Sequence, residues 1–212
     1  FGSVYVDGTE IDDAQAAQVA EAADGSLRAV ALKLGQRVAV LLGEGGAATR
    51  VTVEPAVTGP VERVDATGLS VLGQQVLVNT DDTQGPLTLF GGGYLSLADV
   101  AAGDTVEVHG VRLATGEVRA TRIERLEQPR EWLLSGPVAS LPADRAEITI
   151  GAQRVSLAGA SITPSLLLLE AGVQVRVWAP VGVLEGPVLA ASRVRIAPPA
   201  LSAAPAGAVV QY

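Results

Sequence analysis

The chain of 212 residues has no cysteine, no methionine and a single histidine. Without cysteine, disulfide bonds, thiolate metal sites and cysteine nucleophiles are excluded. The longest uninterrupted apolar run, Val38 to Leu42, is far shorter than the ~20 residues of a membrane-spanning helix. We therefore expect no membrane-spanning segment, and a fold that depends on packing and backbone pairing.

Basic and aromatic residues are also scarce. Fifteen Lys and Arg face 23 Asp and Glu, which gives a net charge of −8, and the basic residues do not cluster. Such a chain repels a phosphate backbone, and two Trp, three Tyr and two Phe offer little surface for base stacking. We expect no nucleic-acid partner.

The absence of methionine extends to position 1, so we expect that a segment has been removed from the front of the chain. A secretory signal is the segment most often removed in this way. This predicts an exported protein that is extracellular or on the cell surface, with the periplasm as another possible location.

What the chain has in abundance is glycine, proline and short alternating runs of valine, the composition of an all-β protein with short strands and tight turns. The one helix-like stretch is the alanine-rich segment from Asp12 to Ala23. Strands such as Thr105 to His109 alternate apolar and polar residues, which indicates one face in a core.

Self-comparison reveals three copies of one unit. Each copy has a Ser-Leu pair, and the three pairs begin at Ser26, Ser96 and Ser165, which are 70 and 69 residues apart. A glycine-led strand follows each pair: LGQRVAV from Leu34, AGDTVEV from Ala102 and AGVQVRV from Ala171. The order strand, turn, strand, Ser-Leu turn, strand, hairpin, strand predicts a five-stranded barrel of the OB type.

The middle copy carries a family resemblance. The sequence GPVERVDATGLSVLGQQVLVNTDDTQ, with SLADVAAGDTVEVHGVRLATGEVRATRIE after it, resembles the bacterial exported family known as domain of unknown function 5666. The start FGSVYVDGTEID resembles members of the same family, whereas the third copy departs most, with SLLLL from Ser165 in place of SLAD from Ser96. The resemblance implies export and small β-barrels and carries no established activity.

The expected architecture is three tandem small OB-like β-barrels with a detached C-terminal strand. The boundaries are 1–56 for barrel 1, 57–127 for barrel 2, 128–134 for a linker, 135–197 for barrel 3, 198–206 for a Pro/Ala linker and 207–212 for the last strand. Barrel 1 has no counterpart of the opening strands that begin at Gly59 and Gly136, so we expect it to lack its first strand.

The C-terminal sequence aligns with those opening strands, with Gly207 on Gly59 and Gly136. We therefore predict that the tail is a donor strand that completes barrel 1. The donor residues are Gly207, Ala208, Val209, Val210, Gln211 and Tyr212. The acceptor residues are Phe1, Gly2, Ser3, Val4, Tyr5 and Val6, together with either Leu34 to Val40 or Ala48 to Val53.

The length of the linker decides which barrel 1 the tail can reach. Three barrels in a row would separate the first from the third by roughly 50 to 60 Å, whereas a nine-residue Pro/Ala linker reaches only ~28 Å. A linear arrangement therefore predicts donation to the next molecule, and a compact triangle would permit self-closure. A frayed or trimmed terminus is the remaining alternative.

Few residues suggest chemistry. His109 has no recognisable partner and is expected at the surface, and the acidic pairs Asp12-Asp13 and Asp81-Asp82 lack the spacing of a calcium loop. The glycine runs at 43–46 and 91–93 lack the lysine of a phosphate-binding loop. We expect no enzyme, no metal and no cofactor, and we expect Trp132 to pack between barrels 2 and 3.

The sequence thus favours a structural subunit of an extracellular or cell-surface filament, a homopolymer that assembles head to tail by strand donation. A monomeric periplasmic or surface module that binds a protein or glycan partner is the alternative. An enzyme acting on a small molecule would need a polar pocket that the sequence does not indicate.

Overall fold

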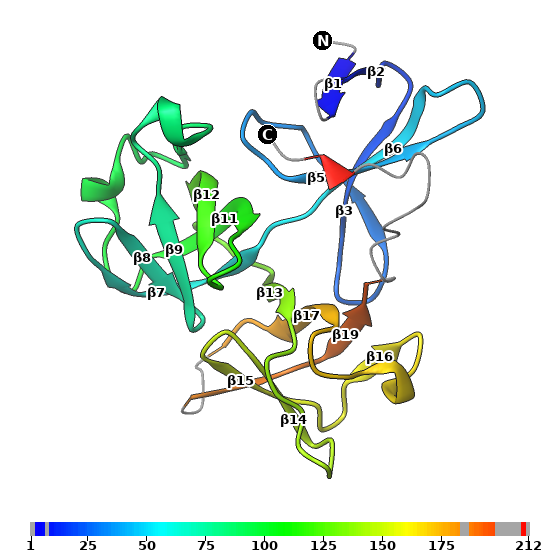
Figure 1. The fold of residues 1–212 in the computed structure, drawn as a ribbon, viewed down its shortest axis with the longest axis vertical. Helices are drawn as coiled ribbons and strands as arrows, with labels where there is room; N and C mark the ends of the chain where they lie inside the picture. The colour runs from blue at the N-terminus through cyan, green and yellow to red at the C-terminus, as the bar shows by residue number, and fades with distance from the viewer. Residues whose placement is uncertain (1–2, 7–8, 183–186, 198–208, 211–212) are drawn as a thin grey trace.

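The computed structural model describes residues 3–6, 9–182, 187–197 and 209–210, and these are organised as three groups of strands arranged in a triangle (Figure 1). The fold class is all-β, as the sequence predicts, and the helical residues of the described part are confined to three short 3-10 turns. We call the three groups unit 1, which contains β1 to β6, unit 2, which contains β7 to β12, and unit 3, which contains β13 to β19.

Unit 2 has strands that pair in a closed ring. β7 pairs with β8, β8 with β9, β9 with β12, β12 with β11, and β11 returns to β7. Only the β9–β12 pairing in this ring is parallel. The elements are β7 (Val57–Val64), β8 (Gly68–Val71), β9 (Gln74–Val78), η1 (Asp82–Gln84), β10 (Leu89–Gly91), η2 (Leu97–Asp99), β11 (Thr105–Arg112) and β12 (Val118–Arg125).

Unit 3 repeats this order. β13 pairs with β17, β17 with β19, and β14 with β15, while the parallel pairings are β15 with β18 and β16 with β19. A bridge between Ser140 and Thr149 links the chain beyond β13 to β14. The elements are β13 (Glu131–Pro137), β14 (Glu147–Ile150), β15 (Gln153–Ser156), β16 (Ser161–Thr163), η3 (Leu166–Leu168), β17 (Gln174–Pro180), β18 (Val188–Ala190) and β19 (Arg193–Ile196).

Unit 1 has the corresponding parallel pairing between β3 and β6, and antiparallel pairing of β5 with β6 and of β3 with β4. Its first two strands form a separate hairpin, β1 with β2. The elements are β1 (Ser3–Val6), β2 (Thr9–Asp12), β3 (Ala17–Glu21), β4 (Leu27–Ala29), β5 (Val38–Leu42) and β6 (Ala48–Val53), and the last strand of the chain is β20 (Val209–Val210).

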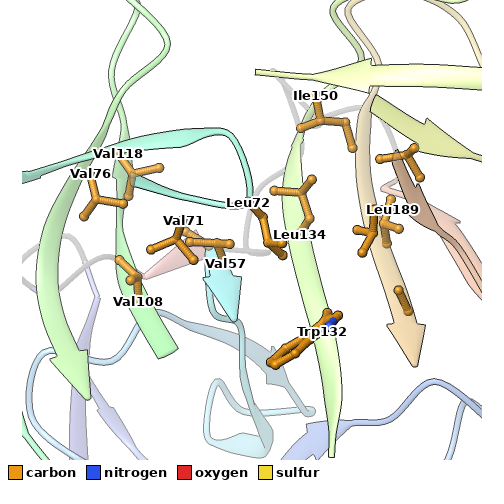
Figure 2. Close-up of a cluster of buried hydrophobic side chains, with 14 of the residues drawn as sticks. Val57, Val71, Leu72, Val76, Val108, Val118, Trp132, Leu134, Ile150 and Leu189 are labelled. Carbon is orange, nitrogen blue, oxygen red and sulfur yellow. The ribbon is translucent and has the colours of Figure 1, made fainter. Parts of the chain in front are cut away.

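Units 2 and 3 share one hydrophobic core, because β7 pairs with β13 through Thr58 with Leu133 and Val57 with Leu134. Figure 2 shows Leu134 on β13 beside Leu72 of unit 2, with Ile150 and Leu189 of unit 3 on its other side. Unit 1 has a smaller core of its own, formed by residues of β2, β5 and β6. The members of this second core are Ile11, Val38, Val40, Ala48, Val51 and Val53.

Three local expectations are wrong. The alanine-rich stretch from Asp12 to Ala23 contains β3 rather than a helix, because residues 17–20 pair with β6 and this tertiary pairing outweighs helix propensity. Ser26 opens no helical turn, whereas Ser96 and Ser165 precede η2 and η3. The Ser26 hydroxyl instead bonds Asp24 within the turn between β3 and β4.

The third correction concerns the linker expected at 128–134. Its last four residues belong to β13, which begins at Glu131 and pairs with β17 from that residue onward. Pro129 suggested a connector in this segment. Trp132 and Leu134 are buried, however, and their burial stabilises a strand there instead. Residues 183–186, between β17 and β18, lie outside the described part of the chain.

Candidate functional site: the edge that receives the C-terminal strand

The C-terminal strand β20 pairs antiparallel with β5, with Val209 opposite Ala39 and Val210 opposite Val38. β1 also contacts β20. The counterparts of β5 and β1 in unit 2 are β11 and β8, and the strand that pairs with both of them is β7. β20 therefore occupies in unit 1 the position that the opening strand β7 occupies in unit 2. Figure 1 shows β20 beside β5.

The sequence of β5 explains why it offers an edge. Val38 and Val40 alternate with Ala39 and point into the core of unit 1, which sets the strand's orientation. One side of β5 bonds β6, so the backbone groups of its other side need a partner, and β20 supplies it at residues 38 and 39.

Of the predicted donor residues, the structure describes Val209 and Val210, and both are in the strand. Gly207, Ala208, Gln211 and Tyr212 lie outside the described residues, as do Phe1 and Gly2 of the predicted acceptor. The remaining acceptor residues, Ser3, Val4, Tyr5 and Val6, form β1. Of the two strands that the sequence left open, the one within Leu34 to Val40 receives β20, whereas Ala48 to Val53 is β6 and lies beyond β5.

The register differs from the sequence alignment by three residues. Gly59 lies opposite Val106 in unit 2, and Gly136 lies opposite Val175 in unit 3, so the alignment would put Gly207 opposite Val38. In the structure Val210 is opposite Val38. A side chain at Gly59 would meet Leu72 at 2.6 Å, and one at Gly136 would meet Ile150 at 2.8 Å. Unit 1 has Asp7 at the matching sequence position, and this residue lies outside the described part of the chain.

The triangular arrangement corrects the argument from linker length. The prediction of donation to another molecule assumed barrels in a row, but unit 3 contacts unit 1 directly, for example through Trp178 Nε1, which donates to the Glu21 carbonyl at 3.3 Å. Twelve residues, 197–208, separate the end of β19 from the start of β20. The tail of one chain can therefore reach its own unit 1.

Unit 2 positions the segment that leads into β5. The Thr121 hydroxyl donates to the Gly35 carbonyl at 2.6 Å, and the Arg122 guanidinium donates to the Leu34 carbonyl at 3.2 Å. Lys33 pairs with Glu124. Although burial acts to raise it, hydrogen bonds from Lys33 and Arg122 hold the pKa of Glu124 below its usual value, so this carboxylate stays charged at neutral pH.

His109 takes part in the same contact, and the expectation that it lies at the surface is wrong. Its side chain is fully buried, and Nδ1 accepts a hydrogen bond from the Arg37 backbone N–H at 3.2 Å. Because Nδ1 accepts, the ring proton is on Nε2, which donates to Glu107 at 2.9 Å. His109 thus holds the backbone one residue before the strand that receives β20.

The repeat offers the signal that could have identified this contact. Leu41, His109 and Trp178 stand at matching places in the three copies, so one strand position carries three different large side chains. His109 and Trp178 are both fully buried and both bond the backbone of unit 1, whereas Leu41 is exposed. A repeat position that varies in this way indicates a contact between units rather than within one.

The other residues considered for chemistry have structural roles in the described part of the chain. Trp132 is buried on β13, beside the residues of this strand that pair with β7 of unit 2. Its position between units 2 and 3 agrees with the expected packing. Asp81 caps η1, and hydrogen bonds from the hydroxyl and backbone of Thr83 lower its pKa from the ordinary value. Within the described residues, no group of three acidic or histidine side chains is placed to hold a metal ion.

The protein is thus an all-β chain of repeated units, and the free edge of β5 pairs with a strand from a distant part of the sequence. Residues 58–124, which lie in unit 2, match the family model described as "Domain of unknown function (DUF5666)". No match was found among curated proteins or among solved structures. Among the described residues, none of the helices has the length and apolar character required to cross a membrane.

Replacing His109 with leucine, the residue of the matching position in unit 1, should lower the free energy of unfolding by about 1–3 kcal/mol. The substitution leaves the part-buried N–H of Arg37 without its acceptor, and a donor left unsatisfied away from water costs up to about that much. His109→Asn is the control, because its side-chain oxygen can still accept, and its loss should be smaller. Urea denaturation of the three proteins measures the difference, and equal losses in both variants would contradict the role assigned to Nδ1.

Proposed function

We propose that each of the three units is a small barrel of the OB type. The support is the strand order, in which the third and fifth strands pair in parallel and the first and fourth pair antiparallel: β9 with β12 and β7 with β11 in unit 2. Unit 3 has the same relations in β15 with β18 and in β13 with β17. A five-stranded Greek-key barrel has this order, and β20 would be the first strand of the barrel in unit 1.

We further propose that the protein is a structural subunit that assembles head to tail, with the C-terminal strand of one copy inserted beside β5 of the next. The observation that carries this proposal is the pairing of β20 with β5 at the position of an opening strand. Strand addition of this kind obtains its affinity from main-chain hydrogen bonds. Because donor and acceptor lie at different places in the chain, the contact is heterologous and can propagate into a filament.

The contact of β20 with β5 of its own chain and its contact with β5 of another chain would use the same strand pairing. Within the described part of the chain, the pairing with β5 involves Val209 and Val210. We propose that this strand, held by backbone hydrogen bonds worth a net ~1 kcal/mol each, can open and exchange. Exchange between chains then competes with self-closure and becomes more favourable as the protein concentration rises.

The location belongs to the same proposal. The resemblance of the middle copy to exported bacterial proteins supports an extracellular or cell-surface filament. An acidic surface with a net charge of −8 would keep the unassembled chain soluble on the way there.

The molar mass of the intact protein as a function of concentration tests the proposal. Light scattering should give a mass that rises with concentration and exceeds that of one chain, and negative-stain electron microscopy of the concentrated sample should show filaments. A mass of 21.6 kDa at all concentrations would contradict head-to-tail assembly.

A binding module is the second candidate function, and one observation favours it. A cavity of about 200 Å³ lies at the junction of the three units and is lined by side chains from each of them, including Arg28, Glu107 and Arg176. A self-closed monomer could present this cavity, whose lining combines charged and apolar side chains, to a protein or glycan. This candidate predicts the constant one-chain mass that would exclude the filament.

A further inference from the structure

Unit 1 is attached to the rest of the chain by polar contacts instead of a shared apolar core. The core of units 2 and 3 is continuous, whereas the core of unit 1 is separate from it. Interfaces between domains that lack a shared core generally permit relative motion. What holds unit 1 against unit 3 therefore decides whether the triangle stays closed.

Two glutamates of unit 1 and three arginines of unit 3 form the centre of that contact. Glu21, the last residue of β3, lies 2.7 Å from Arg193 and 2.9 Å from Arg195. Glu54, directly after β6, lies 3.0 Å from Arg176 and 3.4 Å from Arg195. We call these five residues the ion-pair cluster, and Arg195 connects its two halves.

The ion-pair cluster is shielded from solvent. The side chains of Glu21 and Arg176 are 8% and 7% exposed, and Arg195, at 34%, is the most exposed of the five. Burial lowers the pKa of Arg176, although the neighbouring Glu54 opposes this effect and an arginine remains charged at neutral pH. Charges buried to this extent depend on their partners, so the removal of one partner leaves an uncompensated charge.

Hydrogen bonds to the backbone surround the ion-pair cluster. Arg193 also donates to the Ala22 carbonyl at 3.0 Å, and its guanidinium lies 4.8 Å from the centre of the Trp178 ring. The Ala23 N–H donates to Glu131 at 3.0 Å. The Arg193–Ala22 and Ala23–Glu131 hydrogen bonds join unit 1 to unit 3, so they form or break together with the ion pairs.

We propose that the ion-pair cluster is a latch that keeps unit 1 against unit 3, and that its opening releases the C-terminal strand for donation to another copy. Twelve residues connect β19 to β20, so the strand reaches its own β5 while units 1 and 3 stay in contact. The tail follows unit 3 and β5 belongs to unit 1, so separation of the two units moves β20 away from its own β5. This inference rests on the proposed strand donation and adds the residues that regulate it.

The test uses the double variant Glu21→Gln/Glu54→Gln, which keeps the size of both side chains and removes both negative charges. Arg195→Gln is the milder second variant, because Arg195 is the most exposed member of the cluster. Glu147→Gln is the matched control, because it removes an ion pair with Arg154 that lies within unit 3. Two quantities are measured for each protein: hydrogen exchange of the Ala23 amide, and molar mass at a fixed chain concentration.

If the latch operates, both cluster variants should exchange the Ala23 amide about tenfold faster or more than the unmodified protein. Their assembled fraction should also rise several-fold, and the increase should vanish when residues 207–212 are removed. The control should resemble the unmodified protein in both measurements. Unchanged Ala23 exchange in both cluster variants would overturn the latch, and so would faster exchange without a change in mass in a protein that assembles.

The two proposals can fail separately. If neither the unmodified protein nor any variant exceeds the mass of one chain, strand donation is wrong. The Ala23 exchange then decides the latch alone, since it reports the separation of units 1 and 3 without assembly. Faster exchange would support the latch, and unchanged exchange would overturn it.

Discussion

Replacing both Val209 and Val210 with proline is expected to abolish assembly and to leave a folded protein with the mass of one chain. Proline has no backbone N–H, so the double substitution removes whichever residue donates to β5 and also restricts the backbone. Units 2 and 3 do not need this strand, because their own opening strands are β7 and β13, and in unit 1 the freed edge of β5 can bond water. Light scattering and electron microscopy before and after the change measure the effect.

Two further variants sharpen this experiment. The double change Val209→Ile/Val210→Ile keeps the strand propensity and the N–H groups, so it should assemble as the unmodified protein does. Deletion of residues 207–212 should reproduce the proline variant. Filaments that persist in both the proline variant and the deletion would show that assembly uses another surface.

Replacing Gly110 with alanine should destabilise unit 2 by about 3 kcal/mol or more, a large effect for a single methyl group. Gly110 lies at the irregularity where the register between β11 and β12 shifts. A Cβ atom there would lie 2.2 Å from the Arg119 carbonyl oxygen and 2.9 Å from the Ala120 Cα. These are backbone atoms of the paired strand, so they cannot move aside without breaking the ladder.

Gly182→Ala is the matched control for this change, because a Cβ atom at Gly182 would have no atom within 4 Å. Urea denaturation followed by fluorescence of the two tryptophans should show a large loss for Gly110→Ala and almost none for the control. Because His109 precedes Gly110 and bonds the Arg37 N–H, the destabilised variant should also lose the alignment of β5. Similar stability of both variants would refute the backbone clash.

The repeat made much of the fold predictable. The glycine turns recur because a turn between paired strands needs a backbone conformation that glycine adopts readily: Gly73 has φ +64° and Gly151 has φ +58°. The Ser-Leu pairs predicted η2 and η3 correctly, where Ser165 accepts a hydrogen bond from the Leu167 N–H. The same motif gave a wrong prediction at Ser26. The Ser26 hydroxyl donates a hydrogen bond to Asp24, and the chain continues into β4 instead of a helical turn.

The candidate site was predictable only in part. Similarity to the opening strands identified the tail as a strand, and the two residues of it that the structure describes pair with a strand of unit 1. The register could not be read from the sequence, since it depends on which side chains lie beneath the strand. Leu72 and Ile150 demand glycine in units 2 and 3, and no such pattern specifies the residue opposite Val38.

The all-β class, the repeated order of strands and the strand-like end of the chain could all be predicted from the sequence. These features depend on local alternation, turn residues and backbone pairing, which recur with the repeat. The triangular arrangement of the units, the burial of His109 and the ion pairs of Glu21 and Glu54 with Arg176, Arg193 and Arg195 became visible in the folded chain alone. Contacts between units join residues that are far apart in the chain, at positions where the three copies differ. The repeat pattern therefore does not predict them.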